Sequence, residues 1–295
     1  MKKFLIILLA LSVLTFAVVA QSAVKDKMEG SVVATKIGAS TIHTYVSPEK
    51  SGAVTSHVIE GPKKLVIIDA QFLRPYAKEL RAYADSLGKP IDRVIITHGH
   101  PDHWYGLEFF KDMRVTSLPE VAGLIKQAGP AMIKGQKARL KDLITDAPVV
   151  PDGKMKEGKE TIDGIAYVFE RVKDAEADSQ LLITLPDYGT LVAQDLAYNK
   201  IHLFLGADDI KGWEKVVTEL KKRPGIKTVL CGHGKPAGPI VFDDMLKYLD
   251  VADKSVTLAK KGSHDVKPLL LKEFPDYKAP VLLDISNRML FKKGK

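Results

Sequence analysis

The feature that most constrains this chain is a run of three histidines and one aspartate within residues 98–103, which read HGHPDH. The run directly follows residues 93–96 (RVII), an apolar and β-branched segment that is typical of a buried strand. Histidine nitrogen and aspartate oxygen are ligands that zinc and similar divalent metals accept. The chain has only 8 histidines. Their concentration after a strand therefore predicts a metal site rather than an ordinary polar turn.

The spacing HxHxDH at residues 98–103 resembles the signature of the metallo-β-lactamase superfamily of metallohydrolases. Three single residues elsewhere match further positions of that family's pattern, and each stands at the end of a strand-like apolar run: Asp69, Asp195 and His233. The resemblance extends over roughly residues 31–250. The six-residue motif is specific, whereas the isolated residues add support because their order and strand contexts agree.

One position departs from the family pattern, which usually has a histidine a few residues before a later strand. Counting back from the strand-like residues 181–185, this position falls on Glu176. A glutamate can bind zinc or a harder cation such as Mn²⁺. Asp174 and Asp178 are alternative ligands because the register of the loop is open. A third interpretation is that all three acids belong to a solvated turn.

The resemblance implies two divalent ions, with zinc expected and manganese or iron as alternatives. One ion would be held by His98, His100 and Glu176, the other by Asp102, His103 and His233, and Asp195 would bridge them. Asp69 would orient a ligand through hydrogen bonds. Cys231 is expected to pack in its strand rather than to bind metal, because a strand step of two residues places it about 6.6 Å from His233.

The implied reaction is hydrolysis by a metal-bound hydroxide, with Asp102 able to accept or relay a proton. The expected substrate is a small molecule with a carbonyl group, in an ester, lactone or amide. Tyr198 is a catalytic candidate, because a tyrosine at this spacing is similar to the lactonases of this fold and can donate to an oxyanion; it can also be a core aromatic. Trp104 and Tyr105 can line the pocket mouth or pack beneath the loop.

Other functions remain open: a β-lactamase, a phosphodiester or thioester hydrolase, and a non-catalytic metal-binding scaffold. The absence of a Gly-x-Ser-x-Gly motif agrees with a metal-dependent reaction rather than a serine nucleophile. No nucleic-acid partner is expected, because the formal charge of +8 is a mild excess spread along the chain. The oligomeric state is left open.

Strand-like and helix-like segments alternate in two similar halves, which predicts an α+β fold of two sheets packed face to face between helices, the αββα sandwich that the resemblance implies. Among the expected elements are a helix at 103–111, helical residues 119–146 interrupted at Gly129-Pro130, and a strand at 190–193. The hydrolase domain is expected to span residues 21–262, followed by a C-terminal extension at 263–295 whose role the sequence does not indicate.

Residues 1–20 have the pattern of a secretory signal peptide, with two lysines, an apolar stretch and small residues before Ala20. An uncleaved membrane anchor is the alternative, because the apolar stretch is near the lower length limit for a membrane span. Cleavage predicts a periplasmic or secreted protein with no stable membrane insertion.

Overall fold

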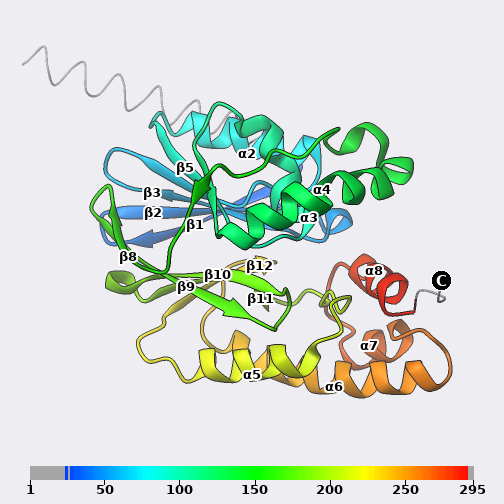
Figure 1. Ribbon diagram of the computed structural model, residues 1–295. Helices are drawn as coiled ribbons and strands as arrows, with labels where there is room; N and C mark the ends of the chain where they lie inside the picture. The colour runs from blue at the N-terminus through cyan, green and yellow to red at the C-terminus, as the bar shows by residue number, and fades with distance from the viewer. Residues whose placement is uncertain (1–23, 26, 292–295) are drawn as a thin grey trace, which may run out of the picture.

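In the computed structural model, which describes residues 24–25 and 27–291, two β-sheets pack face to face and helices cover both outer faces (Figure 1). This four-layer arrangement is the predicted αββα sandwich. The predicted signal peptide lies outside the described residues. Within the part of the chain that is described, no helix combines the length and the apolar character needed to cross a membrane.

The first sheet has seven strands in sequential order, and the second has five in the order β12-β11-β10-β9-β8. The strands of the first sheet are β1 (Ser31–Ile37), β2 (Ser40–Val46), β3 (Thr55–Glu60), β4 (Leu65–Ile68), β5 (Ile91–Ile96), β6 (Val115–Ser117) and β7 (Gly153–Lys154). Those of the second are β8 (Gly158–Ile162), β9 (Ile165–Lys173), β10 (Ser179–Leu185), β11 (Thr190–Tyr198) and β12 (Thr228–His233).

The helices form the two outer layers, with α2 and α4 on the first sheet and α5 and α6 below the second (Figure 1). Their bounds are α2 (Arg74–Ser86), α3 (Pro101–Trp104), α4 (Pro119–Leu140), α5 (Ile210–Lys221), α6 (Val241–Lys261), α7 (Lys267–Glu273) and α8 (Val281–Leu290).

Strands β10 and β11 of the second sheet are buried on both faces, which explains why they contain continuous apolar runs. On β10, Leu181 and Ile183 belong to the core between the sheets, whereas Leu182 between them belongs to the core shared with α5 and α6. Neighbouring residues of a strand point to opposite faces. A strand covered on both sides therefore needs apolar residues at every position.

Two expected elements end differently in the structure. Helix α4 continues through Pro130, so the predicted interruption there is wrong. The buried side chains of Val121, Ile125 and Ile133 hold the helix on the core despite the backbone hydrogen bond that a proline removes. The predicted helix at 103–111 is a single turn, α3, followed by a 3-10 helix at Tyr105–Phe110.

Strand β11 runs to Tyr198, five residues beyond the predicted end. Its parallel pairing with β12 is irregular between Val192 and Gln194 and again between Gln194 and Tyr198. Gln194 has a left-handed backbone, with φ of 44°. Such irregularities turn side chains away from the regular alternation, and here they bring Gln194, Asp195 and Tyr198 to one end of the two sheets.

The C-terminal extension folds as α7 and α8, and its apolar side chains join the core beneath the second sheet. Val266, Leu270 and Leu283 are fully buried there. Backbone bonds also tie it to the loop that follows β11, from His202 N–H to the Lys278 carbonyl and from Lys278 N–H to the Lys200 carbonyl. The extension therefore supports the loop that follows β11.

Candidate metal centre

The HxHxDH motif lies where β5 leaves the first sheet and α3 begins. The last residues of β5, Val94 to Ile96, are fully buried, so the strand end is rigid. His100 is the N-cap residue of α3, and Pro101 at the first helical position fixes the turn. Asp102 and His103 follow in the single turn of that helix. The local sequence thus places the four motif side chains around one short strand-to-helix turn.

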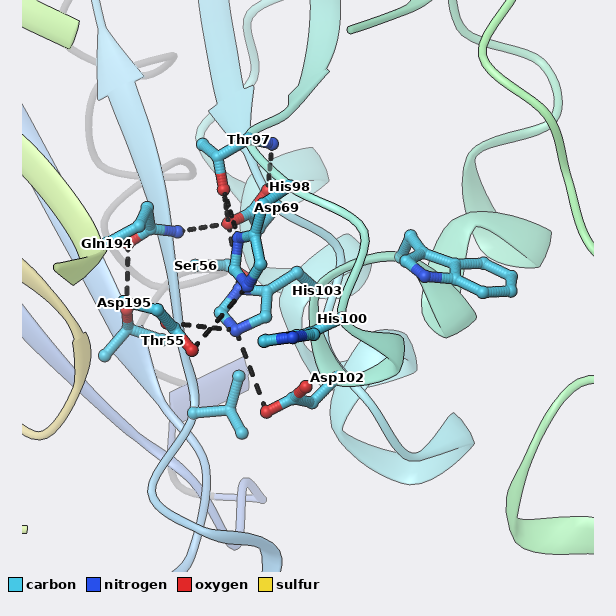
Figure 2. Close-up of polar contacts among 12 residues, drawn as sticks. Thr55, Ser56, Asp69, Thr97, His98, His100, Asp102, His103, Gln194 and Asp195 are labelled. Atoms are coloured by element: carbon cyan, nitrogen blue, oxygen red, sulfur yellow. Dashed lines mark hydrogen bonds and ion pairs between the residues drawn. The ribbon is translucent and has the colours of Figure 1, made fainter. Parts of the chain in front are cut away.

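The structure brings the predicted ligands together. One group of potential donor atoms comes from His98, His100, Glu176 and Asp195, and a second from Asp102, His103 and His233; within each group the atoms lie within 4.8 Å of one another. Asp195 connects the two groups, since its carboxylate oxygens lie 3.6 Å from His98 Nε2 and 3.2 Å from His103 Nε2. Figure 2 shows the motif side chains and Asp195 converging.

In three of the four histidines, Nδ1 is hydrogen-bonded to an acceptor outside the cluster. These bonds assign the tautomers of the three rings. His103 Nδ1 donates to Asp69 Oδ2 at 2.9 Å, and His233 Nδ1 donates to the Gly52 carbonyl at 2.7 Å. Thr97 Oγ1 donates its only proton to Asp69, so it accepts from His98 Nδ1 at 3.0 Å. In each neutral ring the proton is then on Nδ1, and the Nε2 lone pair faces the cluster.

The cluster contains buried polar atoms that have no hydrogen-bond partner. They are Nε2 of His98, His103 and His233, both carboxylate oxygens of Glu176, and Oδ1 of Asp195. Buried polar atoms are rarely left unpaired, because burial without a partner is costly. Imidazole nitrogen and carboxylate oxygen are the donor types that divalent metals accept. The residues present therefore fit a metal centre.

The electrostatics of the cluster also favour bound positive charge. Burial lowers the pKa of His103, but the charge of Asp195 and its other acidic neighbours outweighs burial and holds this pKa well above its usual value. Burial also lowers the pKa of His100, but Glu176 and the other carboxylates outweigh burial and raise this pKa to about 9. The carboxylates thus attract cations, whether protons on the rings or a metal in their place.

Glu176 is buried inside the cluster, whereas the alternative ligands Asp174 and Asp178 are exposed. Its Oε1 lies 3.0 Å from His100 Nδ1, and its Oε2 lies 3.9 Å from His98 Nε2. The buried neighbours Ala175 and Ala177 hold the loop between β9 and β10 against the protein. Of the three acids in this loop, only Glu176 is placed to bind a metal together with the motif.

Tyr198 contacts a ligand rather than open space. Its hydroxyl donates to Asp195 Oδ2 at 2.9 Å, and its ring stacks on His233 at 4.3 Å between centroids. Burial, followed by the nearby carboxylates, holds the pKa of Tyr198 well above its usual value, so the phenol keeps its proton. In this geometry the tyrosine orients Asp195 and His233. Its predicted role as a donor to substrate stays a prediction.

Trp104 and Tyr105 do not line a pocket mouth, because both are fully buried. Trp104 Nε1 donates to the Gly99 carbonyl at 3.0 Å, so the indole packs beneath the motif and fixes its backbone. The accessible side of the cluster is formed instead by His100 and Asp102, whose side chains are 25% and 22% exposed. Phe204 packs edge-on against His100, at 5.4 Å between ring centroids.

The sequence interpretation did not identify several residues that build the site. Gly232 is one, because a Cβ there would lie 1.8 Å from Asp195 Oδ1. Thr97 is another, since it bonds both Asp69 and His98. Gln194 and His57, described below, are buried polar residues far apart in the sequence. Thr97, Gln194 and Gly232 each stand directly before a predicted site residue, which is a weak signal in the sequence. Their contacts, and the role of His57, depend on tertiary structure. Cys231 is buried and belongs to none of the candidate metal groups of the described residues.

Comparison with curated proteins finds the alkyl/aryl-sulfatase BDS1 of Saccharomyces cerevisiae, 26% identical over 264 residues, a match that covers 72% of this chain and 41% of the relative. The chain thus spans about two fifths of the length of that relative. Among solved structures, a metallo-beta-lactamase from Pontibacter korlensis is similar with a TM-score of 0.60 and 20% identity, covering 75% of this chain and 99% of its own.

A second similar structure is the metallo-beta-lactamase FIM-1 from Pseudomonas aeruginosa in its mono-zinc form. Its TM-score is 0.56 at 17% identity, with coverage of 74% of this chain and 95% of its own. At these identities the two structures establish the fold. The family model described as the metallo-beta-lactamase superfamily matches residues 51–233, which include the HxHxDH motif, Glu176, Asp195 and His233. The chain belongs to the metallo-beta-lactamase superfamily and has the fold of that family.

Proposed function

We propose that this protein is a metal-dependent hydrolase of small-molecule esters. The observation that carries the proposal is the set of buried, unpartnered donor atoms on His98, His103, His233, Glu176 and Asp195. Their orientation would leave a large desolvation cost uncompensated unless cations bind there. A non-catalytic scaffold accounts less well for the site, because the cluster also keeps an accessible side at His100 and Asp102.

His98, His100 and Glu176 would hold one divalent ion and Asp102, His103 and His233 another, with Asp195 shared. The donor set, rich in imidazole and carboxylate, suits zinc, and the carboxylates also admit manganese or iron. When bound, such ions supply Lewis acidity that activates water and polarises the bond to be cleaved. The chain's own contribution is orientation: Asp69, Thr97 and the Gly52 carbonyl hold the imidazoles, and Tyr198 holds Asp195.

Asp102 has a further role in the proposal because its carboxylate is partly exposed. Its Oδ2 lies 3.7 Å from His103 Nε2 and 3.5 Å from His233 Nε2. A carboxylate at the edge of the cluster can accept a proton from an incoming water and pass it to solvent. This is the only acid of the cluster with substantial exposure among the described ligands, which makes it the proposed proton acceptor.

Two classes of substrate are proposed. A carbonyl ester, lactone or amide is the first, from the ligand pattern. A sulfate ester is the second, because the curated relative is named an alkyl/aryl-sulfatase. The β-lactamase, phosphodiesterase and thioesterase alternatives have no specific support beyond the shared fold. Export through a cleaved signal peptide, with activity in the periplasm or medium, is also part of the proposal and is tested by the mass of the recovered protein.

The test combines metal analysis with a substrate panel. Protein lacking residues 1–20 is loaded with zinc or manganese, dialysed, and assayed on a carboxylic ester, a lactone, an alkyl sulfate, a cephalosporin, a phosphodiester and a thioester. We expect up to two ions per chain and turnover of a carbonyl ester or the alkyl sulfate. His100→Ala is the control and should lose metal and activity together. Metal content near zero in both proteins would overturn the proposal.

A further inference from the structure

The carboxylate of Asp69, which orients His103, is itself held by a buried side chain from the opposite sheet. Its Oδ1 accepts from Thr97 N–H at 2.8 Å, and its Oδ2 accepts from Thr97 Oγ1 and from His103 Nδ1. The same Oδ2 also accepts from Gln194 Nε2 (Figure 2). Gln194 lies on β11 and Asp69 directly follows β4, so this bond crosses between the sheets.

The direction of this bond determines the next one. An ionised carboxylate only accepts, so the Gln194 amide must turn its NH₂ group towards Asp69 and its oxygen away. That oxygen, Oε1, lies 2.9 Å from His57 Nε2, which must therefore donate. The neutral ring then has its lone pair on Nδ1, which accepts from Thr44 Oγ1 at 2.9 Å. Burial lowers the pKa of His57 to about 4, which agrees with a neutral ring.

The result is a chain of hydrogen bonds with one direction, from Thr44 through His57 and Gln194 to Asp69. All four side chains are fully buried. A polar chain in a dry interior is costly unless every member is satisfied, and when complete it is rigid. The backbone at Gln194 is strained, because this residue adopts the left-handed conformation that a non-glycine residue seldom takes. This conformation places the Gln194 side chain in the chain of hydrogen bonds.

We propose that Gln194 and His57 are positioning residues for the metal centre, which keep Asp69 oriented so that His103 presents its Nε2 lone pair. The inference rests on the proposed metal-dependent function. Gln194 shares the Oδ2 acceptor with His103. Loss of its N–H removes one of the four hydrogen bonds that fix the Asp69 carboxylate, and so weakens the hold of that carboxylate on the His103 ring. Partners that bond a metal-ligating histidine directly typically change metal affinity by about 10- to 100-fold. Gln194 acts one hydrogen bond further out, so we expect an effect near the lower end of this range.

The test measures zinc affinity by competition with a chromophoric chelator, so that it does not depend on a substrate. Gln194→Met keeps the unbranched shape and removes both hydrogen bonds. Gln71→Met is the matched control: Gln71 is also a fully buried glutamine with a left-handed backbone, at φ of 74°, but its side chain donates to the Val54 carbonyl and to Ser56 Oγ. We expect Gln194→Met to lower the affinity for the more weakly bound zinc ion at least tenfold. Gln71→Met should change this affinity less than threefold.

A second pair of variants separates orientation from packing and decides the question if Gln194→Met fails to fold. His57→Leu removes the donor to Gln194, whereas His57→Gln replaces it with an amide N–H at the place of Nε2. We expect His57→Leu to weaken zinc binding and His57→Gln to restore most of it, although both variants lower the melting temperature of the metal-free protein.

Equal zinc affinity in His57→Leu and wild type, or equal losses in Gln194→Met and Gln71→Met, would overturn the inference and leave the proposed function standing. Failure of the wild type to bind zinc or manganese would overturn the proposed function and this inference with it. The two failures are therefore distinguishable in one titration series.

Discussion

At the scale of single residues, Glu176 would set the charge of the proposed metal centre, because an anion stands where the family pattern usually has a neutral imidazole. We expect Glu176→Ala to lose about one metal ion per chain and most activity. Glu176→His should retain metal, and the pKa that governs the rise of kcat/KM with pH should fall, because removing an anion leaves the centre more positive and its water more acidic. Metal analysis and pH–rate profiles measure both effects.

The matched control for this prediction is Asp178→Ala, in the same loop but exposed. It should keep full metal content and activity. If Glu176→Ala behaves like Asp178→Ala, Glu176 is an acid of the loop and not a ligand.

Gly232 limits the space beside Asp195. A Cβ at this position would lie 1.8 Å from Asp195 Oδ1 and 2.7 Å from its backbone nitrogen, so the carboxylate or the strand must move. We expect Gly232→Ala to lower zinc affinity and activity more than tenfold, because a displacement of about 1 Å at a site can cost on the order of 100-fold. Gly238→Ala, where a Cβ would meet nothing within 4 Å, should behave like wild type in the same assays.

At the scale of elements, helix α8 holds the loop that carries Phe204. Ser286 Oγ on α8 donates to the Leu282 carbonyl and accepts from Leu205 N–H at 2.9 Å. Ser286→Ala should leave that N–H unpaired, cost about 1–3 kcal/mol of stability, and raise KM more than it lowers kcat, since Phe204 packs on the accessible His100. Metal content should not change. Thermal unfolding and steady-state kinetics test this.

Ser255→Ala on α6 is a close control for Ser286→Ala. Ser255 Oγ donates to the carbonyl four residues earlier in its helix, as Ser286 does, and no backbone N–H donates to it among the described hydrogen bonds. A change in KM in the Ser255 variant as large as that of Ser286→Ala would contradict the proposed role of the loop.

The ends of elements show what could be predicted from sequence and what could not. The strand before the HxHxDH motif was identified because its apolar run is continuous. The sequence predicts an earlier end for β11, since Gln194 and Asp195 interrupt the apolar pattern although both are buried against polar partners. It also predicts a break in helix α4 at Pro130, because local propensity does not include the packing that retains the helix. Local patterns record burial in apolar surroundings, but not burial within a polar network.

The same distinction applies to the site. His98, His100, Asp102 and His103 could be predicted because they are close together in the sequence and follow one strand. Glu176 required the family pattern as well as a count back from β10. Asp69 could be predicted from the family pattern, but the further partners His57 on β3, Gln194 on β11 and the Gly52 carbonyl have no local connection to the motif in the sequence.

At the scale of the whole molecule, acid should weaken the fold through partly buried ion pairs such as that of Glu60. The hydrogen bond from His43, and beyond it Lys89, outweigh burial and lower the pKa of Glu60 from 4.5 to about 2. This group therefore stabilises the folded state above pH 4.5, and the contribution is lost as pH falls towards 2. Glu60→Gln should lose about 1 kcal/mol at pH 7, and its denaturation midpoint should converge with that of wild type near pH 2.

Metal removal should also change the stability of the whole molecule, since ligands that bind only the folded state stabilise it. Zinc at 100 times its dissociation constant contributes about 2.7 kcal/mol, which corresponds to roughly 5–10 °C in melting temperature for a domain of this size. Differential scanning fluorimetry should show this rise with zinc and its reversal by a chelator. His100→Ala should show a smaller rise, whereas an equal rise would point to binding elsewhere.

The proposed ligands come from both sheets, because His103 follows β5 whereas Asp195 and His233 lie on β11 and β12. A bound ion would therefore be a removable cross-link between two layers that otherwise adhere through apolar packing. Like a disulfide, it closes a long loop of chain, an effect worth about 4–5 kcal/mol for a loop of about 100 residues. The two layers cannot separate until coordination is broken, so the ion should mainly lower the rate of unfolding. Metal supply would then set how long the folded protein survives, as well as whether it reacts.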